Sequence, residues 1–329
     1  MDKIEIINVE EETVSDANSV LKRYGEVLTD KEYITNPAIA RDDELKKLMM
    51  VLLTPEKSGL LVGKPGIGKT AIVEGLSYLI QKNEVPDALK GFRVVKINAP
   101  VLLGKIVTDN REELVINLFI KELEQMDKTI LFIDEVHTLI GSKEGGPMDL
   151  ANILKPSLDR GTVKAIGATT TIEYEQYIIR DRAFLRRFEK IDVEEPDEKT
   201  TVEILVKSLP KIEKQTGIKF KYGSYMTELL IESIVSATSE YKRIYGLAAM
   251  YPDVAFSVLA GAFSQALFQN HHEVDITDVY NAIKTSKRIY PDSIIKELAL
   301  FREKFKSECE KEGIILPIVA IEEIRTEES

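Results

Sequence analysis

A glycine-rich run that ends in a lysine and a threonine is the first candidate for chemistry: Gly63-Lys64-Pro65-Gly66-Ile67-Gly68-Lys69-Thr70. It matches the G-x-x-x-x-G-K-[ST] pattern of a phosphate-binding loop. In such a loop, backbone N–H groups surround phosphate oxygens, the next helix directs its positive end at them, and the lysine reaches the terminal phosphates. The predicted phosphate contacts are Gly63, Lys64, Pro65, Gly66, Ile67, Gly68, Lys69, Thr70 and Ala71, and Thr70 is also expected to hold Mg²⁺.

Two adjacent carboxylates, Asp134 and Glu135, follow the apolar run Ile130-Leu131-Phe132-Ile133. We expect Asp134, at the end of a strand, to hold Mg²⁺ through water, and Glu135 to polarise the water that attacks a phosphoryl group. The adjacent glutamate favours hydrolysis over a small-molecule kinase, in which water must be kept away from the γ-phosphate. The pair therefore predicts hydrolysis of a phosphoryl group.

Two further patterns each have a catalytic and a structural interpretation. Thr170 follows an apolar run, so its hydroxyl either orients the attacking water or caps a helix. Arg186 and Arg187 belong to a basic cluster, which is either a solvated helix face or a pair of arginine fingers that reach a neighbouring subunit's γ-phosphate. These residues alone leave both alternatives open.

The elements that must position these residues follow from the apolar pattern. Short runs at Gly59 to Val62, Arg93 to Ile97, Thr129 to Ile133, Val163 to Ala168 and Lys190 to Val193 predict strands. Because helical stretches alternate with them, we expect an α/β fold with a parallel sheet flanked by helices. The strand signal stops at Pro196, and a small all-helical domain is expected to follow.

We therefore expect four segments: an N-terminal arm at 1–35, a large α/β nucleotide-binding domain at 36–196, a small helical lid domain at 197–290, and a C-terminal helix and tail at 291–329. The apolar tail from Ile314 to Ile324 either packs on the helical domain or docks a partner, and the first is favoured. His137 is predicted to be a structural hydrogen-bonding residue. His271 and His272 are predicted to be solvated loop residues and a poor metal site.

Composition excludes several classes of protein. The 329 residues carry a formal net charge of −11, with 44% hydrophobic and 30% charged residues. Because no apolar run approaches about 18 residues and no signal-peptide core follows Met1, we expect a cytoplasmic globular protein without a membrane span. The single cysteine, Cys309, excludes an intramolecular disulfide. Net acidity argues against nucleic acid as a partner.

Several stretches resemble, in order and spacing, the first ATPase ring of the Clp/Hsp100 AAA+ unfoldases. They are GKPGIGKTAIVEGLSYLI, ILFIDEVHTLIG, ANILKPSLDRG and IGATTTIEYEQYIIRDRAFLRRFEKIDVEEP, preceded by an entry segment, YGEVLTDKEYITNPAIARDDELKKL. The resemblance covers residues 24–196 well and 197–290 loosely. It implies an AAA+ fold, ATP or ADP and Mg²⁺ as cofactors, a ring oligomer with six subunits, and a protein partner.

The resemblance also implies roles for single residues. Lys69 and Thr70 would bind phosphate and magnesium, Asp134 and Glu135 would form the Walker B pair, Thr170 would be the sensor 1 residue, and Arg186 and Arg187 would be the fingers. The segment Pro37 to Arg41 would line the adenine site, with Ile39 as the apolar contact.

Three departures from the family pattern bear on function. The interval Gly104 to Arg111, where the family has a pore-loop aromatic, has none, and Val107 falls about where the tyrosine belongs. The family's Pro-Asp-Lys-Ala signature becomes Pro252-Asp253-Val254-Ala255. The chain also has no room for the family's N-terminal, middle and second ATPase domains, so a one-ring relative is expected.

The leading hypothesis is an ATPase ring that remodels or unfolds a protein partner. The second is an ATP-switched scaffold or regulator that assembles on a dedicated partner without threading it. A DNA-transaction ATPase is the third hypothesis, and net acidity counts against it.

Overall fold

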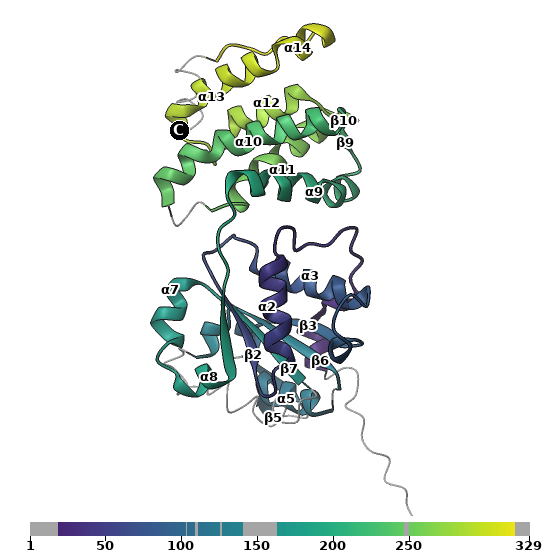
Figure 1. Ribbon diagram of the computed structural model, residues 1–329, viewed down its shortest axis with the longest axis vertical. Coiled ribbons are helices and arrows are strands. Elements are labelled where there is room, and N and C mark those ends of the chain that lie inside the picture. The colour runs from purple at the N-terminus through teal and green to yellow at the C-terminus, as the bar shows by residue number, and fades with distance from the viewer. Residues whose placement is uncertain are drawn as a thin grey trace, which may run out of the picture. The chain divides into compact units, whose positions relative to one another are not determined.

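The computed structural model describes residues 19–102, 104–108, 111–125, 127–140, 163–246 and 250–319 (Figure 1). The chain forms two compact units, each assembled from several stretches. The first unit comprises Met1–Lys31, Met50–Leu60 and Asn83–Glu189, and the second comprises Glu32–Met49, Leu61–Lys82 and Lys190–Ser329. The domain boundaries expected after residues 35, 196 and 290 stay predictions.

A six-stranded sheet has the strand order β1-β3-β6-β7-β2-β8. Its strands are β1 (Glu26–Val27), β2 (Ser58–Val62), β3 (Arg93–Asn98), β6 (Thr129–Asp134), β7 (Val163–Thr169) and β8 (Phe188–Asp192). The pairs β3–β6 and β6–β7 are parallel, which confirms the predicted parallel core and its α/β class. The short strand β1 pairs antiparallel with β3, so the sheet is mixed.

The register of the parallel pairs aligns the ends of β3 and β6. Val94 lies opposite Ile130, Lys96 opposite Phe132, and Asn98 opposite Asp134. The β6 residues from Thr129 to Ile133 are all buried, as expected for a strand covered on both faces. Asp134 therefore emerges from the core where the strand ends.

Short helices and a hairpin complete the first unit. They are α1 (Val20–Tyr24), η2 (Leu28–Asp30), η3 (Asp87–Leu89), α4 (Ala99–Leu102), β4 (Lys105–Thr108), β5 (Arg111–Leu114), α5 (Val115–Gln125), η4 (Val136–Leu139), α7 (Thr171–Glu173), η5 (Tyr174–Ile178) and α8 (Arg182–Arg187). Part of the expected N-terminal arm contacts α5, because Glu122 accepts hydrogen bonds from the N–H groups of Val20 and Leu21 at the start of α1. Helix α2 (Asp42–Leu53) contributes residues to both units.

The second unit contains the helix after the phosphate loop and the predicted helical region. Its elements are α3 (Lys69–Gln81), α9 (Glu198–Thr216), β9 (Lys219–Phe220), α10 (Ser224–Tyr245), α11 (Asp253–Phe268), β10 (Glu273–Val274), α12 (Ile276–Thr285), α13 (Pro291–Lys304) and α14 (Lys306–Glu312). Helix α9 continues through Pro210 to Thr216. Helices α13 and α14 are separated at Phe305.

The described part of the C-terminal tail packs on the helical core, as favoured from the sequence. Ile314 and Leu316 lie against that core, and Val319 is buried within it. The carbonyl oxygen of Pro317 accepts hydrogen bonds from Tyr280 and Arg302. Cys309 is also buried in this core, and burial raises the pKa of its thiol, as does the charge of Glu308. The cysteine is therefore part of the packing.

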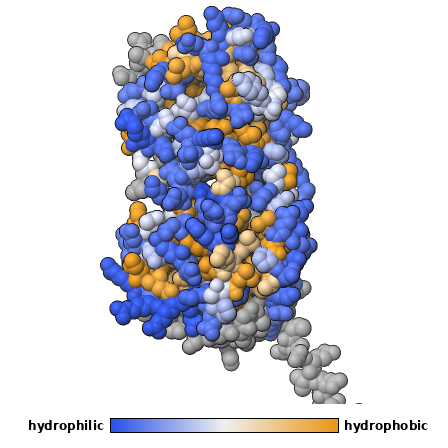
Figure 2. Space-filling view, in the orientation of Figure 1, coloured by the Kyte–Doolittle hydropathy of each residue, from blue (hydrophilic) through white to orange (hydrophobic). Residues whose placement is uncertain are grey.

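Hydrophilic residues dominate the face shown in Figure 2, with hydrophobic residues in scattered patches. Among the described helices, none combines the length and apolarity needed to cross a bilayer.

Candidate nucleotide site

The phosphate loop lies between the buried strand β2 and helix α3, as the motif requires. Gly66 and Gly68 have φ angles of 75° and 98°, in the left-handed region that glycine adopts at little cost. Ile67, between them, is only 1% exposed and anchors the loop. The loop backbone is therefore curled immediately before the N-terminus of α3, in the second unit.

The lysine of the loop is held by the loop itself. Lys69 Nζ donates hydrogen bonds to the carbonyl oxygens of Gly63 and Lys64, at 2.9 and 2.8 Å. Neutral carbonyls are weaker acceptors for an ammonium group than phosphate oxygens. The side chain is therefore in position to exchange these carbonyls for an anionic ligand.

Arg41 fixes the loop from the segment that precedes α2. Its guanidinium donates to the Ile67 carbonyl at 2.7 Å and to the Glu194 carbonyl at 2.9 Å. It also pairs with Glu44 at 2.9 Å, and the arginine is only 7% exposed. The five N–H donors of a guanidinium are fixed in a planar fork and can reach acceptors on several sides, whereas the three donors of a lysine all start from one nitrogen. Sequence reasoning placed Arg41 at the adenine site and missed this role.

The segment expected to line the adenine site belongs to the second unit and approaches α3. Asn36 Oδ1 accepts a hydrogen bond from the N–H of Ala38, which is buried. A side chain at Gly75 of α3 would overlap Ala38, so the two backbones approach closely there. Ile39 is partly buried against the helical core. Its contact with adenine stays a prediction.

Glu195 connects the phosphate loop with the helical region. Its carboxylate accepts a hydrogen bond from the Tyr251 N–H at 2.9 Å and pairs with Lys242 at 3.1 Å and with Lys64 at 3.8 Å. The start of α11 is close to the loop as well, because a Cβ added at Gly66 would lie 2.9 Å from Asp253 Cβ. The Pro252–Ala255 signature, in which the family's lysine is replaced by Val254, therefore lies beside the loop. Sequence reasoning missed Glu195.

In the first unit, the predicted carboxylate pair lies at the end of β6. Glu135 is exposed and has a φ of 54°, an uncommon conformation for a residue other than glycine. Its N–H donates to Asp134 Oδ1 at 3.2 Å. Such backbone strain is typical of functional sites, where the surrounding structure maintains it.

A lysine on the neighbouring strand pairs with this carboxylate. Lys96 of β3 has its Nζ 3.3 Å from Asp134 Oδ2, and about a quarter of each side chain is exposed. Lys96 lies directly opposite Phe132, two residues before Asp134, so the pair is a diagonal contact on one face of the sheet. Sequence reasoning missed Lys96, although a cation inside the apolar run of β3 was a visible signal.

Thr170 begins helix α7 in a capping box. Its hydroxyl accepts the N–H of Glu173 at 3.3 Å, and the Glu173 carboxylate accepts the N–H of Thr170 at 2.9 Å. Thr170 therefore caps a helix, as its structural interpretation predicts. Its role as the sensor 1 residue stays a prediction. Glu173 also receives the hydroxyl of Thr169 at 3.2 Å and lies 3.1 Å from His137 Nδ1.

His137 has the structural role predicted for it. Besides Glu173 it contacts Thr169 at 3.3 Å, and its ring stacks on Tyr177 with centroids 6.1 Å apart. Burial raises the pKa of Glu173, but hydrogen bonds from Thr170, the charge of His137 and the Thr169 hydroxyl outweigh burial and lower it. Glu173 thus contacts both Thr169, at the end of β7, and His137, two residues after Glu135. Sequence reasoning missed Glu173.

The two predicted finger residues occupy the last turn of α8. The Arg186 side chain is exposed, and its backbone carbonyl accepts a hydrogen bond from Lys57 at 2.9 Å. Arg187 is partly buried. Asp181 caps the helix by accepting the N–H groups of Ala183 and Phe184, both at 3.0 Å. The helix thus presents Arg186 to solvent.

In the interval without an aromatic residue, the described residues Lys105–Thr108 form β4, which pairs antiparallel with β5, and the sequence did not predict this pair. Val107 lies in β4 opposite Glu112 of β5. The stretch ANILKPSLDRG, at 151–161, lies outside the described residues.

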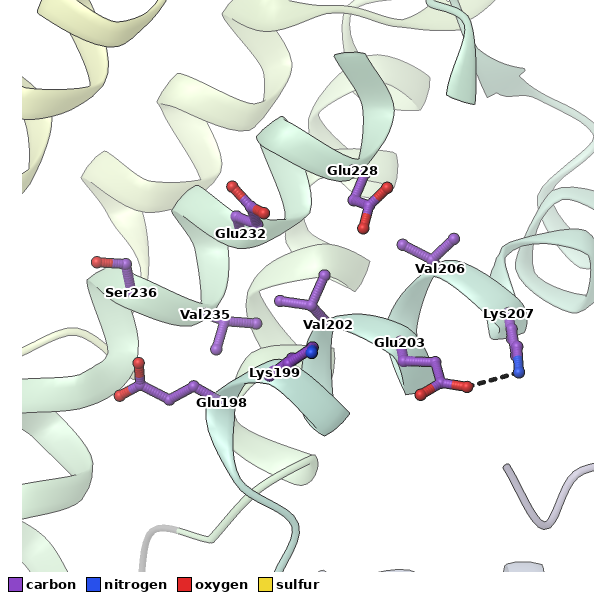
Figure 3. Close-up of a pocket in the computed structure, with 10 residues that line it drawn as sticks. All are labelled: Glu198, Lys199, Val202, Glu203, Val206, Lys207, Glu228, Glu232, Val235 and Ser236. Atoms are coloured by element: carbon purple, nitrogen blue, oxygen red, sulfur yellow. Dashed lines mark hydrogen bonds and ion pairs between the residues drawn. The ribbon is translucent and has the colours of Figure 1, made fainter. Parts of the chain in front are cut away.

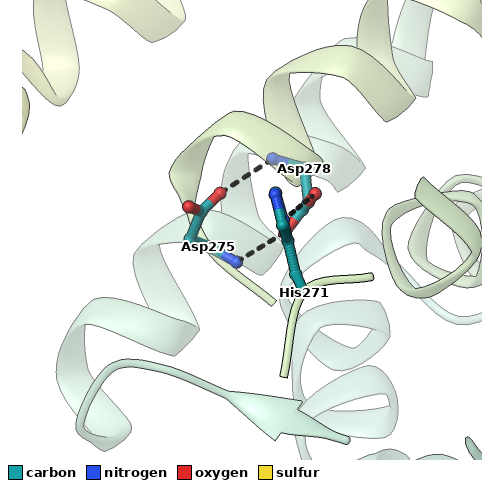
Figure 4. Close-up of side chains that lie close together, drawn as sticks. All are labelled: His271, Asp275 and Asp278. Atoms are coloured by element: carbon teal, nitrogen blue, oxygen red, sulfur yellow. Dashed lines mark hydrogen bonds and ion pairs between the residues drawn. The ribbon is translucent and has the colours of Figure 1, made fainter. Parts of the chain in front are cut away.

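One prediction in the second unit was incomplete. His271 lies in the loop between α11 and β10 and is partly exposed, but its Nδ1 lies 3.0 Å from Oδ1 of the fully buried Asp278, a partner that was not predicted (Figure 4). Asp275 and Asp278 form a capping box at the start of α12, which occupies their oxygens with backbone N–H groups. The cluster is explained by helix capping. The hydrogen bond to Asp278 raises the pKa of His271.

A groove between α9 and α10 was also not predicted. It has a volume of about 630 Å³, a floor of valines and a rim on which glutamates outnumber lysines (Figure 3). Its lining residues are Glu198, Lys199, Val202, Glu203, Val206, Lys207, Glu228, Glu232, Val235 and Ser236. Two of the glutamates are paired, Glu203 with Lys207 and Glu232 with Lys304.

Comparison with known proteins finds a family match and several similar chaperones. Residues 59–193 match the model of the ATPase family associated with various cellular activities (AAA). The chaperone protein ClpB of Pseudomonas putida is 36% identical over 275 residues, which are 80% of this chain and 31% of ClpB. ClpB of Porphyromonas gingivalis is 32% identical over 328 residues, 98% of this chain and 36% of ClpB.

Solved structures agree with these matches. A closed-state structure of Hsp104 with ATPγS and FITC-casein superposes with a TM-score of 0.66 at 25% identity, covering 91% of this chain and 54% of that one. The Hsp104–ADP complex of Saccharomyces cerevisiae gives 0.63 at 30% identity, covering 80% and 44%. The chain spans about a third of the length of its curated ClpB relatives. Residues 59–193 therefore match the AAA family, and the chain as a whole is similar to part of the Clp/Hsp100 AAA+ ATPases.

Proposed function

We propose that this chain binds ATP or ADP with Mg²⁺, hydrolyses ATP at the subunit boundaries of a ring, and uses the energy to remodel a protein partner. The conformation of the phosphate loop carries the proposal. Gly66 and Gly68 adopt left-handed angles before α3, and the Lys69 ammonium is held beside the loop by exchangeable carbonyls. Such a loop binds nucleotide phosphates through backbone N–H groups and a lysine.

The proposed roles of the side chains follow from their chemistry. Thr70 and Asp134 offer hydroxyl and carboxylate oxygens, the donors that Mg²⁺ prefers, so these residues would hold it. When bound, the ion would neutralise charge on the phosphate oxygens. Glu135 polarises the attacking water, and Thr170 orients it while its hydroxyl also caps α7.

Arg186 and Arg187 are proposed to act on the nucleotide of a neighbouring subunit. The exposure of Arg186 supports this, because a finger must be accessible to another chain. A guanidinium that reaches the γ-phosphate offsets the charge that develops there during phosphoryl transfer. A monomer would then lack part of its catalytic site, so the proposal includes a ring, with six subunits expected.

ATP turnover per subunit, measured against protein concentration, tests the ring. Turnover should rise with concentration in the unmodified protein. It should collapse in the Arg186→Ala plus Arg187→Ala protein at every concentration, while nucleotide still binds. Arg182→Ala, an exposed arginine on the same helix, is the matched control and should leave turnover near normal. Turnover that is independent of concentration and survives the double substitution contradicts action in trans.

The partner is proposed from the relatives. ClpB proteins are chaperones, and Hsp104 has been solved with casein, so a polypeptide is the expected substrate. The absence of an aromatic residue between Gly104 and Arg111 favours the second candidate, an ATP-switched scaffold that does not thread its partner. Affinity capture with Glu135→Gln held in ATP, compared with Lys69→Ala, separates them. Many unrelated polypeptides indicate remodelling, and a single stoichiometric partner indicates a scaffold.

A further inference from the structure

We propose that Lys96 acts as a resident counter-cation of Asp134 and thereby raises the Mg²⁺ concentration that the chain needs to bind nucleotide tightly. The inference rests on the proposed function, because it assumes that Asp134 helps to hold the magnesium of a bound nucleotide. It concerns a positioning residue within the first unit. Its evidence is the arrangement of strands β3 and β6.

Both side chains are fixed by the sheet. The parallel register sets Lys96 opposite Phe132, and alternation along β6 directs Phe132 and Asp134 to the same face. The ammonium lies 5.8 Å from the centroid of the buried Phe132 ring and 3.3 Å from Asp134 Oδ2. The aromatic face favours a cation at this position. The lysine is therefore held beside the carboxylate by two neighbours on one strand.

Each carboxylate oxygen of Asp134 already has a partner. Oδ1 accepts the N–H of Glu135 at 3.2 Å, and Oδ2 faces the Lys96 ammonium. If Asp134 holds Mg²⁺ through water, that water would donate to one of these oxygens. The double positive charge of Mg²⁺ is also repelled by an ammonium group a few ångströms away. Lys96 must therefore move, or share the carboxylate, before Asp134 can serve the ion.

The magnesium dependence of nucleotide binding tests this inference without measuring turnover. All proteins carry Glu135→Gln to prevent hydrolysis, and a fluorescent ATP analogue is titrated at fixed low ionic strength over a range of free Mg²⁺. Removing the positive charge with Lys96→Met or Lys96→Gln should lower the half-saturating Mg²⁺ concentration about fivefold, since the pair is only partly exposed. Affinity without Mg²⁺ should change less.

Two control proteins separate the effect of a positive charge at position 96 from the effect of net charge. Lys96→Arg keeps a cation beside Asp134 and should keep the half-saturating Mg²⁺ within about twofold of its original value. Lys90→Met removes one positive charge elsewhere in the same unit, where Lys90 pairs with Asp87 at 2.7 Å. This substitution should not change the half-saturating Mg²⁺ concentration. Thermal melting of each protein verifies folding, and the glutamine variant replaces the methionine variant if the latter does not fold.

The outcomes are distinct. An unchanged or higher half-saturating Mg²⁺ concentration in both neutral Lys96 variants, with nucleotide still bound, overturns the role of Lys96 and leaves the proposed function intact. An equal decrease in the half-saturating Mg²⁺ concentration of Lys90→Met also overturns the role of Lys96, since net charge alone would then explain the effect. A protein that binds no nucleotide at any Mg²⁺ concentration contradicts the proposed function and this inference together.

Discussion

Arg41 donates a hydrogen bond through Nη2 to the carbonyl oxygen of Ile67 at 2.7 Å, so a buried guanidinium just before α2 holds the middle of the phosphate loop. The loop needs such support because Gly66 and Gly68, on either side of Ile67, are the residues with the greatest backbone freedom. The conformation of the phosphate loop therefore depends on Arg41, which lies outside the loop motif.

Arg41→Ala should lower both stability and nucleotide affinity. The substitution leaves Glu44 without its partner at 2.9 Å and removes the donors to the buried Ile67 carbonyl and the partly buried Glu194 carbonyl. The free energy of unfolding should fall by about 3 kcal/mol. Denaturant unfolding measures the first effect, and titration with a fluorescent nucleotide measures the second.

Arg41→Lys and Lys46→Ala are the comparisons for that prediction. A lysine cannot serve the same acceptors with a planar fork, so Arg41→Lys should recover only part of the loss. Lys46 is exposed on α2, and its removal should leave both quantities near normal. Nucleotide affinity that is unchanged in Arg41→Ala would show that the loop keeps its shape without the guanidinium.

Glu173→Ala should impair hydrolysis more than nucleotide binding. The substitution removes one half of the capping box with Thr170 and the partner of His137 at 3.1 Å. Losing a cap costs about 1 kcal/mol, so the fold should survive. Turnover and nucleotide affinity, measured on the same preparation, separate the two effects.

Glu175→Ala is the matched control, since Glu175 is exposed two residues further along the same segment. It should behave like the unmodified protein. Equal losses of binding and turnover in Glu173→Ala would mean that this network does not position the Thr170 hydroxyl for catalysis.

His271 should make the stability of the second unit depend on pH. Hydrogen bonding to Asp278 raises its pKa above the ordinary value of 6.5, so the protonated imidazole is the form that the fold favours. A group whose pKa is raised by folding contributes stability that is fully present below its unfolded pKa. That contribution is lost as pH rises through the folded pKa.

The destabilisation caused by His271→Gln should therefore be larger at pH 6 than at pH 9 in denaturant unfolding. His272→Gln, at the exposed neighbouring position, should cause little change at either pH. A destabilisation by His271→Gln that is equal at both values would mean that the ion pair with Asp278 contributes nothing beyond an uncharged hydrogen bond.

Local sequence predicted the parts of the fold and site that depend on neighbours in the chain. The phosphate loop needs glycines at fixed spacing between a strand and a helix, and the run before Asp134 is apolar because β6 is buried. Both features can be read within about a dozen residues, because strand burial and loop conformation are local properties.

The missed residues depend on contacts between distant parts of the chain. Arg41 reaches a residue 26 positions away and another 153 positions away, and neither separation leaves a pattern in the sequence. Lys96 meets Asp134 only in the observed register of β3 with β6. The partner of His271 was missed because Asp278 is seven positions further on, beyond β10 and in α12.

Glu135→Gln provides the most direct test of ATP hydrolysis by this chain, with Lys69→Ala as its counterpart. ATP binding and steady-state turnover should be measured on both variants and on the unmodified protein. Glu135→Gln should bind ATP normally and lose about a hundredfold or more in turnover, as expected when a general base is removed. Lys69→Ala should lose most of its binding. Near-normal hydrolysis by Glu135→Gln would contradict the assignment of the catalytic base and, with it, the proposed site.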